Sequence, residues 1–251
     1  MWAEEYDKAR PLYAELVKEN PDQFGAVLGY ANTLSNLKEY REALEMVENA
    51  LLLKPGNTSA LTSRKYMNLG YANTFVNNQN YTKGEELLNK IFLDFPEDKD
   101  ALLNLANLYL ITKQVDSAKV MYQRYATSPK DSITALNGMA LAEHIGEKDK
   151  KALNIATIAK SKIARFKDYE LTQRTSDRYV QALIWNRKFG KAKKQIDSLE
   201  TVYPDCNWVH ALRATLGLYT GDTKAAINHY DAILENDSNS FDGNLGKANA
   251  L

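Results

Sequence analysis

Hydrophobic and polar positions along the chain follow the period of amphipathic helices. Between prolines, apolar residues recur at three- and four-residue steps, which places their side chains on one face of a helix. Glycine and proline, which interrupt helices, account for only 12 and 6 of the 251 residues. The pattern therefore predicts an all-α protein.

In addition to the helical period, the sequence repeats with a second, longer period. A small residue followed four positions later by an apolar one recurs with a period of about 34 residues, and two of the intervals are longer by about two helical turns. Small residues suit the points where two helices cross, because larger side chains would hold the axes apart. Helix pairs of this kind bury their apolar faces by stacking on one another. The recurring pairs are Ala9/Tyr13, Ala43/Val47, Gly84/Leu88, Ala118/Tyr122, Ala152/Ala156, Ala192/Ile196 and Ala226/Tyr230.

The segment ALLNLANLYLITKQVDSAKVMYQRYATSP, residues 101–129, resembles the tetratricopeptide repeat, a helix-turn-helix unit of about 34 residues. The positions that match this family in type and spacing are Leu102, Leu105, Ala106, Tyr109, Ala118 and Tyr122. The period continues from residue 6 to residue 251. The resemblance implies an α-solenoid, a right-handed superhelix of about seven repeats and about 14 helices, with half-repeats at both ends.

The period also predicts the repeat boundaries. We expect a half-repeat at 1–23, repeats at 24–57, 58–98, 99–132, 133–166, 167–206 and 207–240, and a half-repeat at 241–251. The two longer intervals predict lengthened first helices near residues 58–77 and 169–187. Because the chain ends in a half-repeat at Leu251, which the pattern makes an apolar core position, we expect it to be a piece of a longer protein.

Composition narrows the possible functions. With 32 basic and 32 acidic residues, the chain has no overall charge that would attract nucleic acid or a membrane. No apolar run is long enough to span a membrane, and no signal peptide is visible. The single cysteine, Cys206, excludes an internal disulfide. These observations leave the compartment open between the cytoplasm and the periplasm.

No catalytic, metal or cofactor site is expected. The three histidines, His144, His210 and His229, lie in different repeats. Metal-ligand spacings and glycine-rich phosphate loops are both missing from the sequence. Cys206 follows a proline in a predicted turn, where a structural thiol is the simplest interpretation. The sequence therefore predicts a protein that is not an enzyme.

The pentapeptide LGYAN, at residues 28–32 and again at 69–73, predicts a row of amides. The resemblance implies that the first helices of the repeats line an inner groove, with Asn32, Asn73 and Asn107 at the same groove-facing position. Their amides could bind a ligand's main chain or hydroxyl groups, or they could tie neighbouring helices together. The lysine of the carboxylate-clamp repeats is replaced by leucine, so that clamp is not expected. The glycines Gly29, Gly70 and Gly138 leave room for a partner's backbone or for a neighbouring helix.

A basic band supplies a second candidate site. Residues 147–194 contain 14 Lys and Arg against 5 Asp and Glu, whereas both flanks are acidic. Within the band, one helical stripe carries Arg174, Arg178, Gln181 and Trp185. Arginine and tryptophan are frequent in recognition hot spots, and this stripe would suit an acidic peptide or an anionic polymer. Alternatively, the stripe is a solvated face whose Trp185 packs against the next repeat. The acidic flanks make nucleic acid an unlikely partner.

These patterns predict a non-enzymatic scaffold that binds a protein segment in its groove. An alternative function comes from residues 225–251, AAINHYDAILENDSNSFDGNLGKANAL, which resemble the periplasmic repeat arrays of bacterial outer-membrane cellulose- and polysaccharide-export proteins. That resemblance implies a role in polysaccharide export.

Overall fold

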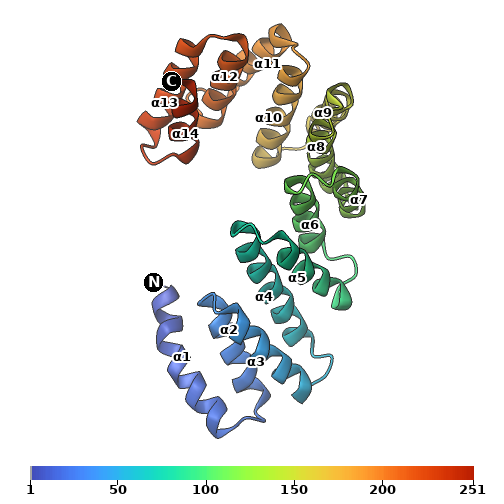
Figure 1. Cartoon of the computed structure of the whole chain (residues 1–251), viewed down its shortest axis with the longest axis vertical. Coiled ribbons are helices and arrows are strands. Elements are labelled where there is room, and N and C mark those ends of the chain that lie inside the picture. Colours follow the sequence, from blue (N-terminus) through green and yellow to red (C-terminus); the bar gives the residue numbers. More distant parts are fainter. Residues whose placement is uncertain (1) are drawn as a thin grey trace. The chain divides into compact units, whose positions relative to one another are not determined.

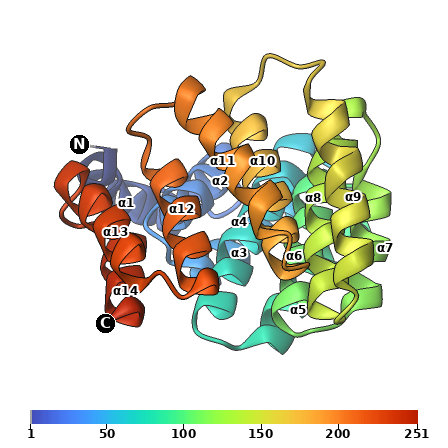
Figure 2. The same cartoon turned by 90° about the horizontal axis from the view of Figure 1, so that it is seen from above.

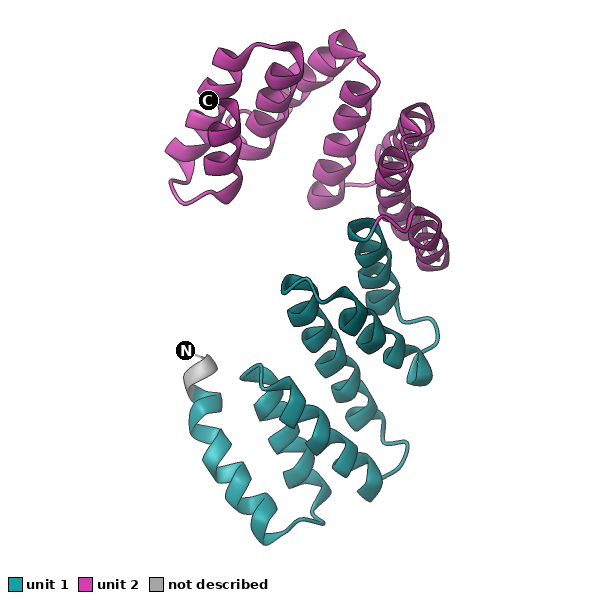
Figure 3. Cartoon of the chain, in the orientation of Figure 1, with its two compact units in different colours: residues 1–112 teal, residues 113–251 magenta. Residues whose placement is uncertain are grey.

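The computed structural model describes residues 2–251, with side chains from residue 5 onward. Within this range the chain forms 14 helices and no strand (Figure 1), which confirms the predicted all-α class and the number of helices. The helices belong to two compact units, residues 1–112 and residues 113–251 (Figure 3).

Unit 1 is a stack of six helices. The longest, α4, runs without interruption for 20 residues across the first segment where the repeat interval is longer. The helices are α1 (Trp2–Glu19), α2 (Phe24–Asn36), α3 (Tyr40–Leu53), α4 (Thr58–Asn77), α5 (Tyr81–Asp94) and α6 (Lys99–Ile111).

Unit 2 is a stack of eight helices. Its helix α10 has 17 residues and follows the connection at residues 164–168, in the second segment with a longer interval. The helices are α7 (Val115–Tyr125), α8 (Pro129–Ile145), α9 (Asp149–Ile163), α10 (Tyr169–Trp185), α11 (Phe189–Val202), α12 (Asn207–Thr220), α13 (Thr223–Asn236) and α14 (Phe241–Ala250).

The helices of the two units contact one another in the same pattern. Within each unit, every helix packs on its neighbour along the chain, as Figures 1 and 2 show for α8 and α9. In addition, even-numbered helices touch the next even-numbered helix: α2 with α4 and α4 with α6 in unit 1, and α8 with α10, α10 with α12 and α12 with α14 in unit 2. Odd-numbered helices make no such contact within the described residues. The even-numbered helices therefore form an inner row in each unit.

Alanine at the helix crossings explains how closely the helices approach. Apart from Ala9, which is half-buried, the small residues of the period are buried, as the crossing geometry requires, because a small side chain lets two backbones come together. The alanines with no exposed surface at these positions are Ala31, Ala43, Ala72, Ala106, Ala118, Ala140, Ala152, Ala192, Ala214 and Ala226.

The turns inside the helix pairs repeat as well. In each turn one residue adopts a positive φ, at the second position before the next helix begins, and these residues follow one another with the period of the repeats. A side chain in this region costs about 1–2 kcal/mol, which only glycine avoids. The residues are Lys38, Gln79, Lys113, Glu147, Arg187 and Gly221.

One expectation about the core is wrong. Leu251 is 88% exposed, whereas the preceding Ala250 is buried against the last helices of unit 2. Adjacent residues near a helix end point in different directions, so α14 turns only one of them inward. No helix within residues 2–251 is both long and apolar enough to cross a bilayer.

Candidate functional site

The predicted amide row lies on the inner row of unit 1. Asn32, Asn73 and Asn107 belong to α2, α4 and α6, and the last two side chains are exposed. The amides of Asn32 and Asn73 form no hydrogen bond to any residue that the structure describes. These two amides therefore do not tie neighbouring helices together, and their binding to a partner stays a prediction.

The glycines beside this row are covered by tyrosine rings of the preceding helices. A methyl group added at Gly29 would lie 2.5 Å from Cε1 of Tyr13, which is far inside van der Waals contact. The space at these glycines is thus filled by a neighbouring helix, one of the two predicted alternatives. The tyrosine and glycine pairs are Tyr13/Gly29, Tyr40/Gly70 and, in unit 2, Tyr122/Gly138.

The predicted stripe lies on α10, in unit 2, but its two arginines have different surroundings. Arg174 has a side chain that is 63% exposed and forms an ion pair with Glu170 at 2.6 Å. Arg178 is half-buried and its Nη1 donates a hydrogen bond to Oε1 of Gln181 at 2.7 Å. Gln181 in turn donates from Nε2 to both carboxylate oxygens of Asp177, at 3.1 and 3.0 Å. Only Arg174 is therefore directly available to a partner.

Trp185 is held by the preceding helix pair. Its ring lies parallel to the ring of His144 on α8, with 3.7 Å between the centroids. His144 Nδ1 lies 2.6 Å from Oδ1 of Asp149, which fixes the imidazole. The guanidinium of Arg178 lies 5.8 Å from the centre of the Trp185 ring, within the range of a cation–π interaction. Trp185 is therefore packed, as the alternative predicted, but the predicted partner was wrong, because its ring stacks on the preceding repeat and not on the next one.

Polar groups next to the stripe are left without partners. Arg178 Nε and Asn137 Oδ1 are both buried atoms that form no hydrogen bond within the described residues. Burial raises the pKa of Asp177, although Arg178 and the Gln181 amide oppose this shift. Burial also lowers the pKa of Arg178. An unpaired buried polar atom costs about 1–3 kcal/mol, so these two atoms weaken the packing of α10 on α8.

A cavity of about 510 Å³ lies beside this group, between the inner-row helices α10, α12 and α14. Arg174 and Asp177 of α10 line it, together with Trp208 of α12 and Asp242 of α14. Trp208 Nε1 donates a hydrogen bond to the hydroxyl of Tyr169, also in the lining, at 3.2 Å. A cavity of this size is within the range of pockets that bind ligands.

The charges of this cavity favour a basic ligand. Arg174 is already paired with Glu170, whereas Asp177 and Asp242 form no ion pair in the described part of the chain. Aromatic faces attract a cation within about 6 Å. The lining of carboxylates, Trp208 and Tyr169 therefore suits a lysine or arginine side chain better than the acidic peptide or anionic polymer that the sequence suggested.

Sequence reasoning overlooked most of this lining, although the period contained the signal. Arg174, Trp208 and Asp242 follow one another at the repeat period, so they occupy one position on three successive first helices. Of these three, only Arg174 lies on the stripe that the pattern along one helix predicts. One repeat position compared across successive first helices predicts Trp208 and Asp242 as well.

The histidines and the cysteine do not belong to the stripe or the amide row, although His144 stacks on Trp185. His210 and His229 approach each other with 3.2 Å between their Nδ1 atoms, but residues 5–251 contain no group of three or more ligands that could hold a metal ion. Cys206 is a half-buried free thiol at the entrance to α12.

Comparison with protein families identifies the repeats. Residues 3–63 and residues 69–132 each match a tetratricopeptide repeat model. Comparison with curated proteins found no match.

Similar solved structures extend this result to the fold of the whole chain. A tetratricopeptide repeat protein from Parabacteroides merdae ATCC 43184 has a TM-score of 0.66 at 14% identity, with 98% of this chain and 92% of that chain covered. Yeast Tom70 has a TM-score of 0.57 at 15% identity, with 99% and 57% covered. The hetero-tetramer Cut9–Hcn1 of the APC/C has a TM-score of 0.57 at 15% identity, with 98% and 46% covered. At these identities the likeness concerns the fold.

Proposed function

Since the chain belongs to the tetratricopeptide repeat family, we propose that it is a non-enzymatic scaffold that binds a segment of a partner protein on the inner row of unit 2. The cavity between α10, α12 and α14 is the observation that carries this proposal. A chain of similar fold is assembled with other chains in the Cut9–Hcn1 hetero-tetramer.

The partner segment presents a basic side chain to the cavity. Asp177 and Asp242 supply two carboxylates that lack ion pairs within the described residues, and Trp208 and Tyr169 supply aromatic surface. A cation that loses water in such a site gains both ionic and cation–π attraction. Apolar residues beside the cation would then contact Ala211 and Ile233, which also line the cavity.

Fluorescence anisotropy with a labelled, capped peptide of alternating arginine and leucine tests this proposal. Tyr169→Ala should weaken binding by roughly two- to thirtyfold, which corresponds to a cation–π contribution of about 0.5–2 kcal/mol. Tyr219→Ala is the matched control, because Tyr219 is 56% exposed, close to the 54% of Tyr169, but lies outside the cavity. Equal losses in the two variants, or no binding by the unmodified protein, would reject the site.

A further inference from the structure

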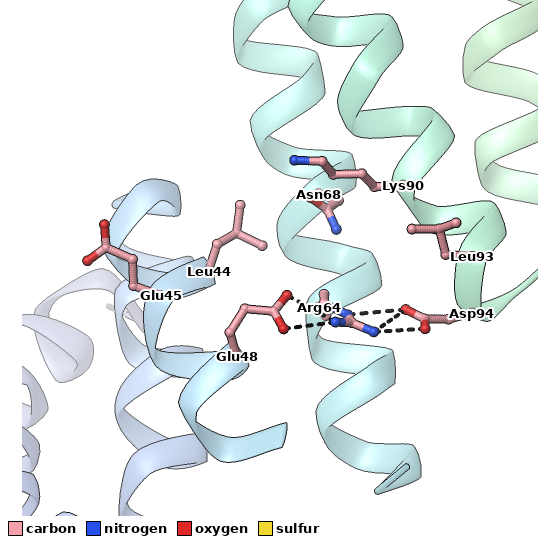
Figure 4. A pocket seen from close by; sticks show the side chains of 8 residues that line it. All are labelled: Leu44, Glu45, Glu48, Arg64, Asn68, Lys90, Leu93 and Asp94. Atoms are coloured by element: carbon pink, nitrogen blue, oxygen red, sulfur yellow. Dashed lines mark hydrogen bonds and ion pairs between the residues drawn. The ribbon is translucent and has the colours of Figure 1, made fainter. Parts of the chain in front are cut away.

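Unit 1 contains a second cavity, away from the amide row. It has a volume of about 400 Å³ and opens between the second helices α3 and α5 and the first helix α4. Figure 4 shows its walls: Leu44 on α3, Asn68 on α4 and Leu93 on α5, with the Arg64 ion pairs at one end. Leu93 is 83% exposed, so an aliphatic surface faces solvent at the entrance.

The Asn68 side chain is the unusual feature of this cavity. Only 4% of the residue is exposed, yet its amide forms no hydrogen bond with any residue in the described part of the chain. The same repeat position holds Val27 in the preceding repeat and Leu102 in the following one, and both are 1% exposed. An amide therefore replaces a core hydrophobe at this one repeat of unit 1 and turns its donor and acceptor toward the cavity (Figure 4).

The cavity is lined by three carboxylates (Glu45, Glu48 and Asp94) and two cations (Arg64 and Lys90), and each of these charges already has an ion-pair partner. Arg64 pairs with Glu48 at 2.9 Å and with Asp94 at 2.7 Å. Burial would lower the pKa of Arg64, but the hydrogen bonds to Glu48 and Asp94 outweigh that effect and raise it. Lys90 pairs with Glu86 at 3.2 Å. Because the ions are occupied, the groups left for a ligand are an amide and aliphatic surface.

We propose that this cavity binds an extended peptide segment of a partner protein, through one main-chain amide against Asn68 and one aliphatic side chain between Leu44 and Leu93. A primary amide offers both a donor and an acceptor, which match the C=O and N–H of a peptide main chain. Because each charged side chain of the lining already has an ion-pair partner, the cavity favours an uncharged segment, in contrast to the basic side chain proposed for unit 2. The two sites are thus independent, and a failure at one does not affect the other.

The probe for this site is N-acetyl-leucine N-methylamide, which carries two peptide groups and one leucine side chain. Titration followed by NMR should produce saturable shifts of the Asn68 side-chain amide and of the methyl groups of Leu44 and Leu93. Asn68→Leu should weaken binding about tenfold, the effect of losing a paired donor and acceptor. Leu93→Glu, at an exposed position where folding is not at risk, should also weaken it.

Asn77→Leu is the matched control, because Asn77 lies on the same helix, α4, but is exposed and outside both the cavity and the amide row. It should bind the probe as the unmodified protein does. The proposal is overturned if the probe shifts other residues only, if no shift saturates, or if Asn68→Leu and Leu93→Glu both bind with unchanged affinity.

Discussion

The ring of Tyr13 in α1 lies directly against the backbone of Gly29 in α2, so that an added methyl group would approach its Cε1 to 2.5 Å. The same relationship joins Tyr122 to Gly138 in unit 2. Glycine at this position lets an aromatic side chain cross the neighbouring helix at close range. The recurring LGYAN pentapeptide is thereby explained up to its last residue, since its alanine fills a helix crossing and its glycine accepts a tyrosine ring.

Gly29→Ala should therefore destabilise the protein. The new methyl group must displace the Tyr13 ring, and overpacking of this kind costs about 1–3 kcal/mol. Gly25 lies one turn earlier in the same helix, and a methyl group there would meet nothing within 4 Å. Gly25→Ala should be neutral or stabilising by up to about 1 kcal/mol. Urea unfolding of the two variants checks the difference, and equal effects would contradict the close approach.

The Arg64 ion pairs should stabilise unit 1. Arg64→Ala leaves Asp94, whose side chain is only 17% exposed, without its partner (Figure 4). The expected loss is about 1.5–3 kcal/mol, the range for hydrogen bonds to charged groups. Arg41→Ala removes an exposed pair with Glu45 and should cost less than about 1 kcal/mol. Denaturant unfolding at low salt would show equal losses for the two variants if the Arg64 pairs were unimportant.

Asn68→Leu should raise the free energy of unfolding, since it places an aliphatic side chain at the repeat position where the neighbouring repeats bury Val27 and Leu102. The expected gain is about 1–2 kcal/mol, because part of the new side chain faces the open cavity. Asn73→Leu, at an exposed position of the same helix, should change stability by less than about 0.5 kcal/mol. Thermal unfolding measures both changes, and a loss of stability in Asn68→Leu would mean that the amide is satisfied.

Acid should destabilise unit 2 through His229. Burial, followed by the charges of His210 and Arg213, lowers the pKa of His229 below its ordinary value of 6.5, while Glu200 opposes the shift. The unfolded chain therefore binds a proton more readily than the folded one, so stability falls as the pH drops below 6.5. The free energy of unfolding, measured across this range, should fall less steeply in His229→Gln. If the free energy of unfolding falls equally steeply with pH in His229→Gln and in the unmodified protein, groups other than His229 cause the loss of stability.

The sequence was sufficient for the fold because the packing of repeats depends on spacing. Small residues at Ala43 and Ala118 predicted helix crossings, and both are fully buried. The environment of the α10 stripe was not predictable in this way, because it depends on contacts between helices. Trp185 stacks on His144 of the preceding repeat, and periodicity shows which face a residue occupies but not what meets it there. The export role that residues 225–251 suggested stays a prediction.

The most direct test of the central claim is a charge exchange at the cavity of unit 2. Anisotropy titrations would compare a capped peptide of alternating arginine and leucine with one in which glutamate replaces arginine, each against the unmodified protein and Asp242→Lys. If the cavity selects a basic partner side chain, the unmodified protein binds the arginine peptide more tightly, and Asp242→Lys reduces or reverses that preference. Glu235→Gln, which removes an exposed charge outside the cavity, should leave the preference unchanged. Equal affinity of the unmodified protein for the two peptides, or an unaltered preference in Asp242→Lys, would contradict the account.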